Sequence, residues 1–579
     1  MAVPCVRLAL LLCLMIPATV ASPRSRSLRK SPAHASASRP TAFFEVDRPP
    51  RARGSSGRRC STLLLSASFG STFDKPPATA AYSPPSCLVK AGGRASAISL
   101  AVLEWRAACR GPQLDRIFGV WLAGAELLRG STAAPPPNGI VWSVSKDVTR
   151  YASLLAAAGN STFAVYLGNH VNATLTGVYH ANVTLHLYLR RTPTTKPTPA
   201  TAPADLIVPM SRTLPLNGGL WFPIQSAADV ASKSVALPSN TYRAVLELYF
   251  SSHQDDELWY KNQPGYQNGP FREVTARVDG VLAGSVCPFP VIYTGGIYPL
   301  LWRPIAPIGS FNLPTYDIEL TPFLGKLLDG KAHEFAFAVT NAMDVWYIDA
   351  NLHLWLDPRG TATTAGLVSY AAPPTNTTSS KSADPVDTHY HATADRLVSA
   401  TGWVKSSYGN ITTNATRTFA LDYLLTFETL DLTIVADTGV VATDGAGGVL
   451  YSAQTHGNFP LGWVYQQNSL TVTHGLEETT VAAGRWSSAP PYRSLRTTQS
   501  SLVEDEEGGD KSWGVRQTYR YNATDGCYFR NVTSSNYSVV SDHSNELCVK
   551  GAASARSWHC HGRATGGESS IVTFNFQNQ

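Results

Sequence analysis

Alternation of apolar and polar residues constrains the fold of this chain more than any other feature. Residues 184–190 alternate leucine with polar or aromatic residues, and residues 351–357 repeat the pattern. Residues 245–250 and 334–339 behave similarly. A period of two over such lengths is typical of half-buried antiparallel strands, whereas long helical periodicity is hard to find. The sequence therefore predicts an all-β protein, which its many Gly, Pro, Trp and Tyr residues also favour.

Two segments share one local pattern. Residues 147–155 precede a Gly/Asn turn and a predicted strand at 162–167, and residues 318–328 precede an Asp-Gly turn and the strand at 334–339. Each segment indicates a strand, a short helical turn, a tight turn and another strand. A repeated pattern of this kind predicts a duplicated β-sandwich, with coincidence as the alternative.

Two breaks in composition divide the chain. Residues 192–203 are a Thr/Pro run, and residues 360–387 are rich in Ser, Thr, Pro and Ala, so neither can build a core. Proteolytic cleavage in the second break would leave two associated chains. The predicted organisation is a signal peptide at 1–22, a basic disordered leader at 23–55, a first sandwich at 56–190, a linker at 191–204, a second sandwich at 205–358, a flexible linker open to processing at 359–395, and a C-terminal β-rich domain at 396–579.

The N-terminus has the layout of a secretory signal. Arg7 precedes an apolar run at 8–16, followed by small residues. That run is too short to span a membrane, and no later segment reaches the roughly 18 apolar residues required. The net charge of the chain is +6, but residues 23–59 carry +8 and Arg7 carries +1, which leaves −3 for residues 60–579. A nucleic-acid partner therefore has little support.

The cysteines predict an oxidised protein. Seven remain after the signal, which implies three disulfides and one leftover thiol, or an intermolecular bridge. Cys60 and Cys87 are a plausible local pair. Cys109 is read as half of a disulfide, against the alternative of a thiol nucleophile. No cysteine or histidine spacing indicates a metal site, and no motif implies a cofactor.

Glycosylation sequons point to the same compartment. Clusters of Asn-x-Ser/Thr predict exposed turns in a glycoprotein that passes through the secretory pathway. The sequons begin at Asn160, Asn172, Asn182, Asn376, Asn410, Asn414, Asn522, Asn531 and Asn536.

An acidic and aromatic segment is the first candidate site. Asp255, Asp256 and Glu257 stand beside Trp259 and Tyr260. Carboxylates carry out proton transfer, aromatic faces stack on sugar rings, and crowding raises the pKa of one carboxylate. The alternatives are a solvated acidic loop, a calcium-ligand set and ordinary core aromatics.

A second candidate is Asp115, which lies at the start of an apolar strand within residues 113–122. Its alternative is a surface ion pair with Arg116, which would contribute little. Asp115 and Glu257 can meet only if two sandwiches face each other.

Longer strings resemble a known family. The chain resembles the plant-type peptide-N-glycosidase A family, which are glycopeptide amidases of the secretory pathway. The resemblance runs from about residue 43 to the C-terminus and is densest before 358. The matching strings are residues 43–50, 115–122, 139–147, 269–273, 288–296, 302–305 and 345–357. Against this pattern Cys287 is unexpected, and it is the candidate for the leftover thiol.

A fainter similarity links the chain to bacterial peptide-N-glycosidase F, which has two eight-stranded jelly rolls with the site between them. Its essential aspartate lies in a Trp-Asp-Arg string, which Asp115-Arg116 resembles with Leu114 in place of Trp. Its second-domain glutamate precedes a Trp, which Glu257-Leu-Trp259 resembles. A further bacterial glutamate has no acidic counterpart here. The resemblance therefore implies two tandem jelly-roll-like antiparallel β-sandwiches.

The resemblance implies hydrolysis of the amide that joins N-acetylglucosamine to asparagine in N-glycosylated peptides or unfolded glycoproteins, without cofactor or metal. The alternatives are a carbohydrate-binding sandwich without catalysis and a glycoside hydrolase. The expected catalytic residues are Asp115 as the principal carboxylate, Glu257 as its partner and Asp256 as a reserve. The expected substrate contacts are Arg116 and Arg272 on the amide, and Trp259, Tyr260 and Trp302 on the glycan.

Overall fold

Strands dominate this protein. Its computed structural model describes residues 41–42, 58–135, 139–190, 202–384, 387–487, 491–506, 512–535, 538–546, 548–550 and 558–560. Helices within these residues are short turns, which confirms the predicted all-β fold. In this part of the chain, no helix is long and apolar enough to cross a membrane. The predicted signal peptide and nearly all of the leader lie outside the described residues.

The first sandwich has two antiparallel sheets with a common core. One sheet runs β7-β4-β9-β2, with the short strand β1 (Thr41–Ala42) added parallel to β7, and the other runs β3-β8-β5-β6. Alternate residues of β9 are buried, as the pattern at 184–190 predicts. The strands are β2 (Arg58–Phe69), β3 (Ala78–Tyr82), β4 (Ile98–Arg110), β5 (Ile117–Leu122), β6 (Ala125–Ser131), β7 (Ile140–Asp147), β8 (Ser161–Leu167) and β9 (Val178–Leu189).

The second sandwich is also made of two sheets. One runs β10-β18-β13-β16, with β11 paired to β18, and the other runs β12-β17-β14-β15. The remaining predicted strands, near 245, 334 and 351, correspond to β13, β17 and β18. The strands are β10 (Leu206–Pro209), β11 (Phe222–Ile224), β12 (Ala231–Ala236), β13 (Thr241–Ser252), β14 (Glu273–Val278), β15 (Val281–Val286), β16 (Tyr316–Glu319), β17 (Ala332–Thr340) and β18 (Trp346–Leu356).

Both sandwiches have the same strand order, which confirms the predicted duplication. With β1 and β11 set aside, each has one sheet in the order sixth-third-eighth-first and one in the order second-seventh-fourth-fifth. The sixth and seventh strands are joined by helical turns in both copies. These turns are η3 (Thr149–Tyr151) with α3 (Ala152–Ala156), and η7 (Thr321–Phe323) with α4 (Leu324–Leu327).

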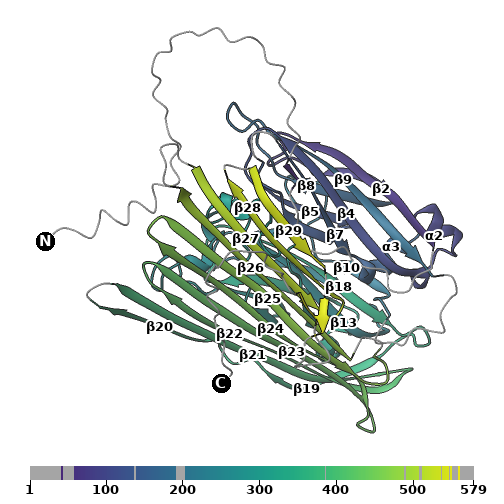
Figure 1. Cartoon of the computed structure of the whole chain (residues 1–579). Coiled ribbons are helices and arrows are strands. Elements are labelled where there is room, and N and C mark those ends of the chain that lie inside the picture. Colours follow the sequence, from purple (N-terminus) through teal and green to yellow (C-terminus); the bar gives the residue numbers. More distant parts are fainter. Residues whose placement is uncertain are drawn as a thin grey trace, which may run out of the picture. The chain divides into compact units, whose positions relative to one another are not determined.

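The C-terminal part of the chain forms one long antiparallel sheet. From β21 to β29 each strand pairs with the next, and Figure 1 shows them as a row of neighbouring strands coloured green to yellow. The strands are β19 (Thr364–Ala371), β20 (Asn376–Ala383), β21 (Thr388–Ser406), β22 (Gly409–Leu425), β23 (Thr429–Asp444), β24 (Val449–Gln466), β25 (Ser469–Ala483), β26 (Tyr492–Glu506), β27 (Ser512–Ala523), β28 (Gly526–Ser535) and β29 (Ser538–Asn545). A short pair, β30 (Cys548–Lys550) and β31 (Trp558–Cys560), follows.

The flexible linker predicted at 359–395 differs from the structure. Strands β19 and β20 and the start of β21 occupy most of this segment, and both β19 and β20 pair with β21. The many Thr residues favour extended backbone, and the ladder hydrogen bonds order a segment that has almost no apolar side chains to bury. The idea of two chains cleaved in this segment therefore has no support in the structure.

The long sheet is anchored to the second sandwich by polar and tight contacts. Tyr423 OH donates to the carbonyl of Asn262 at 3.0 Å, and Tyr370 OH donates to the carbonyl of Leu282 at 3.0 Å. Gly402 on β21 lies directly over the backbone of Pro322, where a Cβ would overlap the Pro322 carbonyl. The sheet and the sandwich are therefore in close contact rather than joined by a tether.

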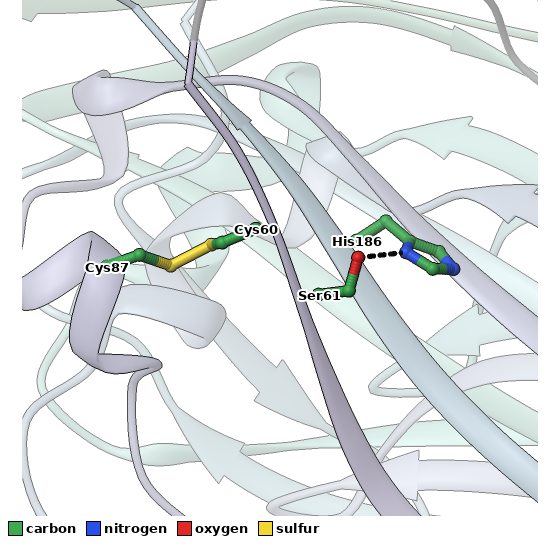
Figure 2. Close-up of a disulfide and its surroundings, with 4 residues drawn as sticks. All are labelled: Cys60, Ser61, Cys87 and His186. Carbon is green, nitrogen blue, oxygen red and sulfur yellow. Dashed lines mark hydrogen bonds between the residues drawn. A yellow bond between two sulfur atoms is a disulfide. The ribbon is translucent and has the colours of Figure 1, made fainter.

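The disulfide predicted between Cys60 and Cys87 is present and joins β2 to α2 (Ser86–Lys90) (Figure 2). Beside it, Ser61 Oγ and His186 Nδ1 are 2.7 Å apart across β2 and β9. Cys527 is also disulfide-bonded. Cys109 and Cys287 are both free and buried, so the expectation of a single leftover thiol is wrong.

Cys109 is therefore neither half of a disulfide nor an activated thiol. It lies in the core of the first sandwich on β4, and burial raises the pKa of its thiol to about 12. A thiolate nucleophile needs the opposite shift. Cys109 is buried because it occupies one of the inward-facing positions of β4.

The sequon asparagines are mostly exposed, although many lie on strands rather than in the predicted turns. Asn160 and Asn172 lie outside strands, while Asn522 on β27 is half-buried and Asn536 falls outside the described residues. The exposed ones are Asn160, Asn172, Asn182, Asn376, Asn410, Asn414 and Asn531. Their exposure is compatible with the attachment of a glycan.

We expect Gly402→Ala to destabilise the protein by about 1–3 kcal/mol, because the new methyl group must displace backbone at the contact between the long sheet and the second sandwich. Gly439→Ala, also on a strand of that sheet, is the matched control, since nothing lies within 4 Å of its added Cβ. Chemical unfolding of both variants measures the difference. Equal stability of the two would contradict the close contact.

Candidate active site

Asp115 and Glu257 come from different sandwiches and lie within electrostatic reach of each other. Asp115 sits in the connection between β4 and β5, and Glu257 sits in the connection between β13 and β14, between η4 (Gln254–Asp256) and η5 (Trp259–Lys261). The negative charge of Asp115 contributes to the raised pKa of Glu257. Both side chains are half-buried. The fold thus brings the two connections near enough for the charge of one carboxylate to act on the other.

The backbone of the second sandwich holds Asp115. The N–H of Gly295 donates to Asp115 Oδ2 at 3.0 Å. Burial raises the pKa of Asp115, while this hydrogen bond and the charges of Arg116 and Arg303 oppose that rise. A Cβ at Gly295 would overlap Asp115 Oδ1, so only glycine permits so close an approach.

Further hydrogen bonds join the same loop to the first sandwich. Thr294 Oγ donates to the carbonyl of Thr132 at 2.9 Å and accepts from the N–H of Ala134 at 3.1 Å. Thr132 Oγ in turn accepts from the N–H of Arg116 at 2.9 Å. These bonds fix the backbone on both sides of the Asp115–Gly295 contact, so the position of Asp115 depends on both sandwiches.

Glu257 has the pKa of a proton donor. Burial and, to a smaller extent, the charge of Asp115 raise its pKa to about 7, while Lys261 opposes the rise. Because Asp115 acts as a negative charge while Glu257 titrates, Asp115 ionises first. At pH values between the two pKa values, the pair therefore consists of the Asp115 carboxylate and the Glu257 carboxylic acid. This is the arrangement that acid–base catalysis needs.

Asp256 and Arg272 form a structural ion pair, which corrects both predictions for them. Their side chains are fully buried, and Arg272 donates to the two oxygens of Asp256 at 2.5 and 2.9 Å. Trp346 Nε1 and the N–H of Met343 also donate to Asp256 Oδ2, at 2.6 and 2.8 Å. With its oxygens occupied inside the fold, Asp256 is no reserve catalyst, and Arg272 has no access to a substrate.

The predicted stacking aromatics are core residues. Trp259, Tyr260 and Trp302 are 1%, 0% and 0% exposed, so none offers a ring face to a glycan. Tyr260 OH donates to the carbonyl of Val291 at 3.3 Å, and Trp302 Nε1 donates to the carbonyl of Gly296 at 2.8 Å. Composition alone could not separate this core role from sugar binding, because both use the same ring surface.

Four residues of the site were missed in the sequence. Gly295 holds the Asp115 carboxylate, and Thr294 holds the backbone of the first sandwich beside it. Arg303 lies near enough to lower the pKa of Asp115. Burial raises the pKa of Tyr293, and the nearby charges of Glu257 and Asp115 also raise it. The signal for three of them was the Gly-Gly pair at the end of the string 288–296. Adjacent glycines in an otherwise apolar segment often mark a close backbone approach.

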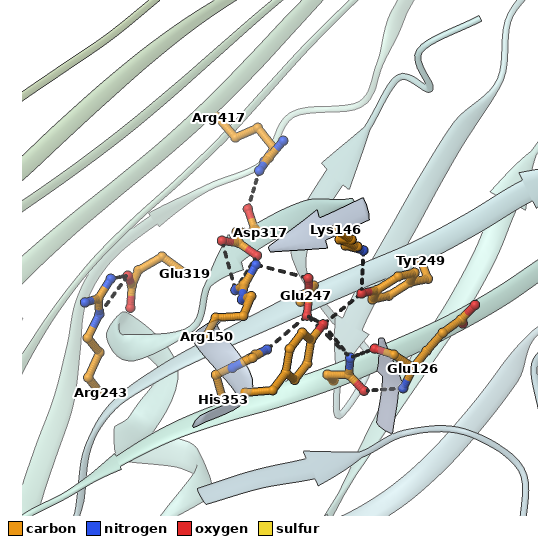
Figure 3. Close-up of polar contacts among 12 residues, drawn as sticks. Glu126, Lys146, Arg150, Arg243, Glu247, Tyr249, Asp317, Glu319, His353 and Arg417 are labelled. Atoms are coloured by element: carbon orange, nitrogen blue, oxygen red, sulfur yellow. Dashed lines mark hydrogen bonds and ion pairs between the residues drawn. The ribbon is translucent and has the colours of Figure 1, made fainter. Parts of the chain in front are cut away.

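The two sandwiches also meet through a partly buried polar cluster away from this pair (Figure 3). Arg150 from the first sandwich donates to Glu247 at 3.0 Å and to Asp317 at 3.0 Å, and His353 Nε2 lies 3.0 Å from Glu247. Burial would raise the pKa of Glu247, but Arg150 and His353 hold it far below its usual range. A cavity of about 670 Å³ lies beside the cluster, lined by Arg150, Asp317, Arg417 and neighbours, and includes neither Asp115 nor Glu257.

The described residues contain no group of three or more His, Cys, Asp or Glu side chains arranged to hold a metal. Asp255, the remaining member of the acidic cluster, is exposed to solvent. The three adjacent carboxylates thus have three different environments, and Glu257 is the one that faces Asp115.

Known proteins are similar to this chain. A family model described as "Peptide N-acetyl-beta-D-glucosaminyl asparaginase amidase A" matches residues 48–373. The chain is 43% identical over 548 residues to the peptide-N4-(N-acetyl-beta-glucosaminyl)asparagine amidase A of Prunus dulcis, which covers 88% of this chain and 94% of that protein. Among solved structures, PNGase F, a glycosylasparaginase from Flavobacterium meningosepticum, is similar over 52% of this chain and 96% of its own, with 15% identity and a TM-score of 0.34. Recombinant peptide:N-glycanase F gives 16% identity and a TM-score of 0.35 over the same shares.

We expect Arg272→Met to cost about 3–5 kcal/mol, because it leaves the Asp256 carboxylate buried without its partner. Arg485→Met is the control, since it breaks an exposed pair with Asp444 and should cost less than about 1 kcal/mol. Denaturant unfolding of the purified variants measures both. If Arg272→Met were as stable as Arg485→Met, the structural assignment of this pair would be wrong.

Proposed function

The chain belongs to the peptide N-acetyl-β-D-glucosaminyl asparaginase amidase A family, and we propose that it cleaves the amide bond between an N-linked glycan and the asparagine that carries it. The products are an aspartate in the peptide and a glycosylamine, which then loses ammonia. The observation that supports this most directly is the position of Asp115, which the Gly295 N–H of the other sandwich holds within electrostatic reach of Glu257.

The two carboxyl groups have complementary roles in this proposal. Asp115, ionised first, takes a proton from a water molecule whose oxygen attacks the carbonyl carbon of the asparagine side chain. Glu257, still protonated, gives its proton to the nitrogen that leaves with the glycan. One C–N bond breaks and one C–O bond forms. Before the next turnover Asp115 must lose the proton that it took, and Glu257 must regain the proton that it gave.

Arg116 is suited to stabilise the negative charge that develops on the amide oxygen. It follows Asp115 directly and lies close enough for its charge to lower the Asp115 pKa. One guanidinium nitrogen donates to Gln113 Oε1 at 2.9 Å, while Nε has no hydrogen-bond partner among the described residues. Since this Nε is buried, the feature that suits oxyanion stabilisation is the guanidinium charge held next to the reacting carboxylate.

We propose that the substrates are N-glycosylated peptides or unfolded glycoproteins and that the enzyme acts in the secretory pathway, the extracellular space, the cell wall or the vacuole. The Cys60–Cys87 disulfide supports an oxidising compartment, and the exposed sequon asparagines are compatible with glycosylation of the enzyme itself. The proposed chemistry requires neither a metal nor a cofactor.

Replacing either carboxyl group should stop glycan release. We expect Asp115→Asn and Glu257→Gln to lower the rate by about 100- to 10,000-fold, the range of a positioned acid or base, with unfolding curves close to that of the wild type. Mass spectrometry of one digested glycopeptide in water labelled with heavy oxygen measures the reaction. Amidase action leaves one labelled aspartate in the peptide.

The same experiment separates the alternatives. A carbohydrate-binding protein would leave the glycopeptide mass unchanged, and a glycoside hydrolase would leave a sugar on asparagine. Full activity of Asp115→Asn would remove the assignment of its carboxylate. Full activity of Glu257→Gln would remove the second-sandwich half of the mechanism.

The rate should depend on pH with an optimum on the acidic side of neutrality. Above the Glu257 pKa of about 7 the acid loses its proton and the rate falls. Below the Asp115 pKa, which burial raises, the base is protonated and the rate falls again. Measured kcat/KM against pH should therefore be bell-shaped. The residual activity of Glu257→Gln should lack the alkaline decline, and a decline that persists in that variant would assign it to another group.

A further inference from the structure

We propose that Gln517, on the long C-terminal sheet, is a positioning residue for the catalytic carboxylate Asp115. This inference rests on the proposed function and adds a role for a part of the chain that the family match at 48–373 does not reach. It is carried by a series of hydrogen bonds, linked by short runs of backbone, that begins at the Gln517 amide and ends at Asp115.

The first step joins the sheet to the segment 301–305 of the second sandwich. Gln517 Nε2 donates to the carbonyls of Leu301 and Ile305, each at 2.7 Å, and Gln517 Oε1 accepts from the N–H of Ile305 at 3.0 Å. All three partners belong to one backbone segment. Since the N–H of Ile305 can only donate, this contact also fixes which way the amide points.

The second step runs along that segment to the catalytic loop. Trp302 lies inside the segment, and its Nε1 donates to the carbonyl of Gly296 at 2.8 Å. The neighbouring residue, Gly295, supplies the N–H that holds Asp115 Oδ2. Gln517, Trp302 and Gly296 are buried, whereas Gly295 and Asp115, at the end of the series, are half-buried. A displacement of residues 301–305 is therefore passed on through the Trp302 side chain to the backbone at 295–296, and from there to the Asp115 side chain.

A parallel contact supports the same segment. Ser534 Oγ, on β28, donates to the carbonyl of Arg303 at 3.2 Å, and an Arg303 guanidinium nitrogen donates to the carbonyl of Ala134 in the first sandwich at 3.1 Å. Arg303 is also one of the charges that lower the pKa of Asp115. The long sheet thus holds two neighbouring points of the segment that carries both Trp302 and Arg303.

The chemistry of Gln517 favours this role over ordinary packing. It faces inward on β27 between Val515 and Tyr519, and all three side chains are buried. A buried amide is unfavourable unless its hydrogen bonds are made, and a methionine of similar shape would fill the same space. What the amide adds is the three bonds to 301–305, so its benefit lies in the position of that segment.

The test compares Gln517→Met with two control variants of the same sheet. Gln454→Met replaces an exposed glutamine on β24, and Val472→Ala removes buried volume on β25 without touching the series. Glycopeptide cleavage is measured across pH, and unfolding is measured for each variant. For Gln517→Met we expect kcat to fall about 10- to 100-fold with KM little changed, because misplacement of a catalytic group affects chemistry more than binding. The controls should keep wild-type kcat.

The pH profile separates positioning from loss of stability. Weakening the Gly295–Asp115 hydrogen bond removes a contact that stabilises the ionised carboxylate, so the acidic limb of the Gln517→Met profile should move to higher pH. Val472→Ala should lose stability without moving that limb. Gly295→Ala, which acts at the far end of the series, should move the limb in the same direction as Gln517→Met.

Ser534→Ala is a milder variant in case Gln517→Met fails to fold, and it should shift kcat and the acidic limb in the same direction by less. Wild-type cleavage of the glycopeptide is required first, and its absence would overturn the proposed function itself. If the wild type is active while folded Gln517→Met, or Ser534→Ala in its place, matches the controls in kcat and pH profile, Gln517 is structural only and the inference is overturned.

Discussion

The hydrogen bond from the Gly295 N–H to Asp115 is the contact on which the candidate site depends. It joins one sandwich to the other, and the approach is so close that Gly295 has no room for a side chain. The two sandwiches must therefore be aligned in one particular way for this hydrogen bond to form. The Thr294 bonds to the first sandwich and the Arg150–Glu247–Asp317 cluster provide that register from two places. An ion-pair cluster of this kind is weak evidence for stability in general. Because its hydrogen bonds form only in one geometry, it is suited to fixing the orientation of one sandwich against the other.

Burial also determines the chemistry of the pair. A carboxyl group whose pKa rises to about 7, next to one that ionises first, needs partial exclusion from water and a negative neighbour together. Neither condition would hold on an isolated sandwich, where both connections would face solvent. By bringing their connections together, the fold raises the pKa of Glu257 as the proposed pairing of an acid with a base requires.

Local pattern was enough to predict the strands and the duplication, because alternation and the helical turns near 151 and 322 depend only on neighbouring residues. The Cys60–Cys87 pair was predictable for the same reason. The roles of Asp256, Trp259 and Trp302 were not, since a buried ion pair and a core indole have the composition of a sugar site. The linker at 359–395 was misjudged because its strands are ordered by pairing with β21 rather than by apolar side chains.

The shared strand order gives the carboxylates an unexpected relationship. In each sandwich the connection between the third and fourth strands supplies one of them, Asp115 between β4 and β5 and Glu257 between β13 and β14. The site is therefore built where two copies of one connection face each other, as a symmetric dimer would build it from two identical chains. Covalent linkage of the copies frees each to carry a different residue, so acid and base can differ where identical subunits would have to place the same group on both sides.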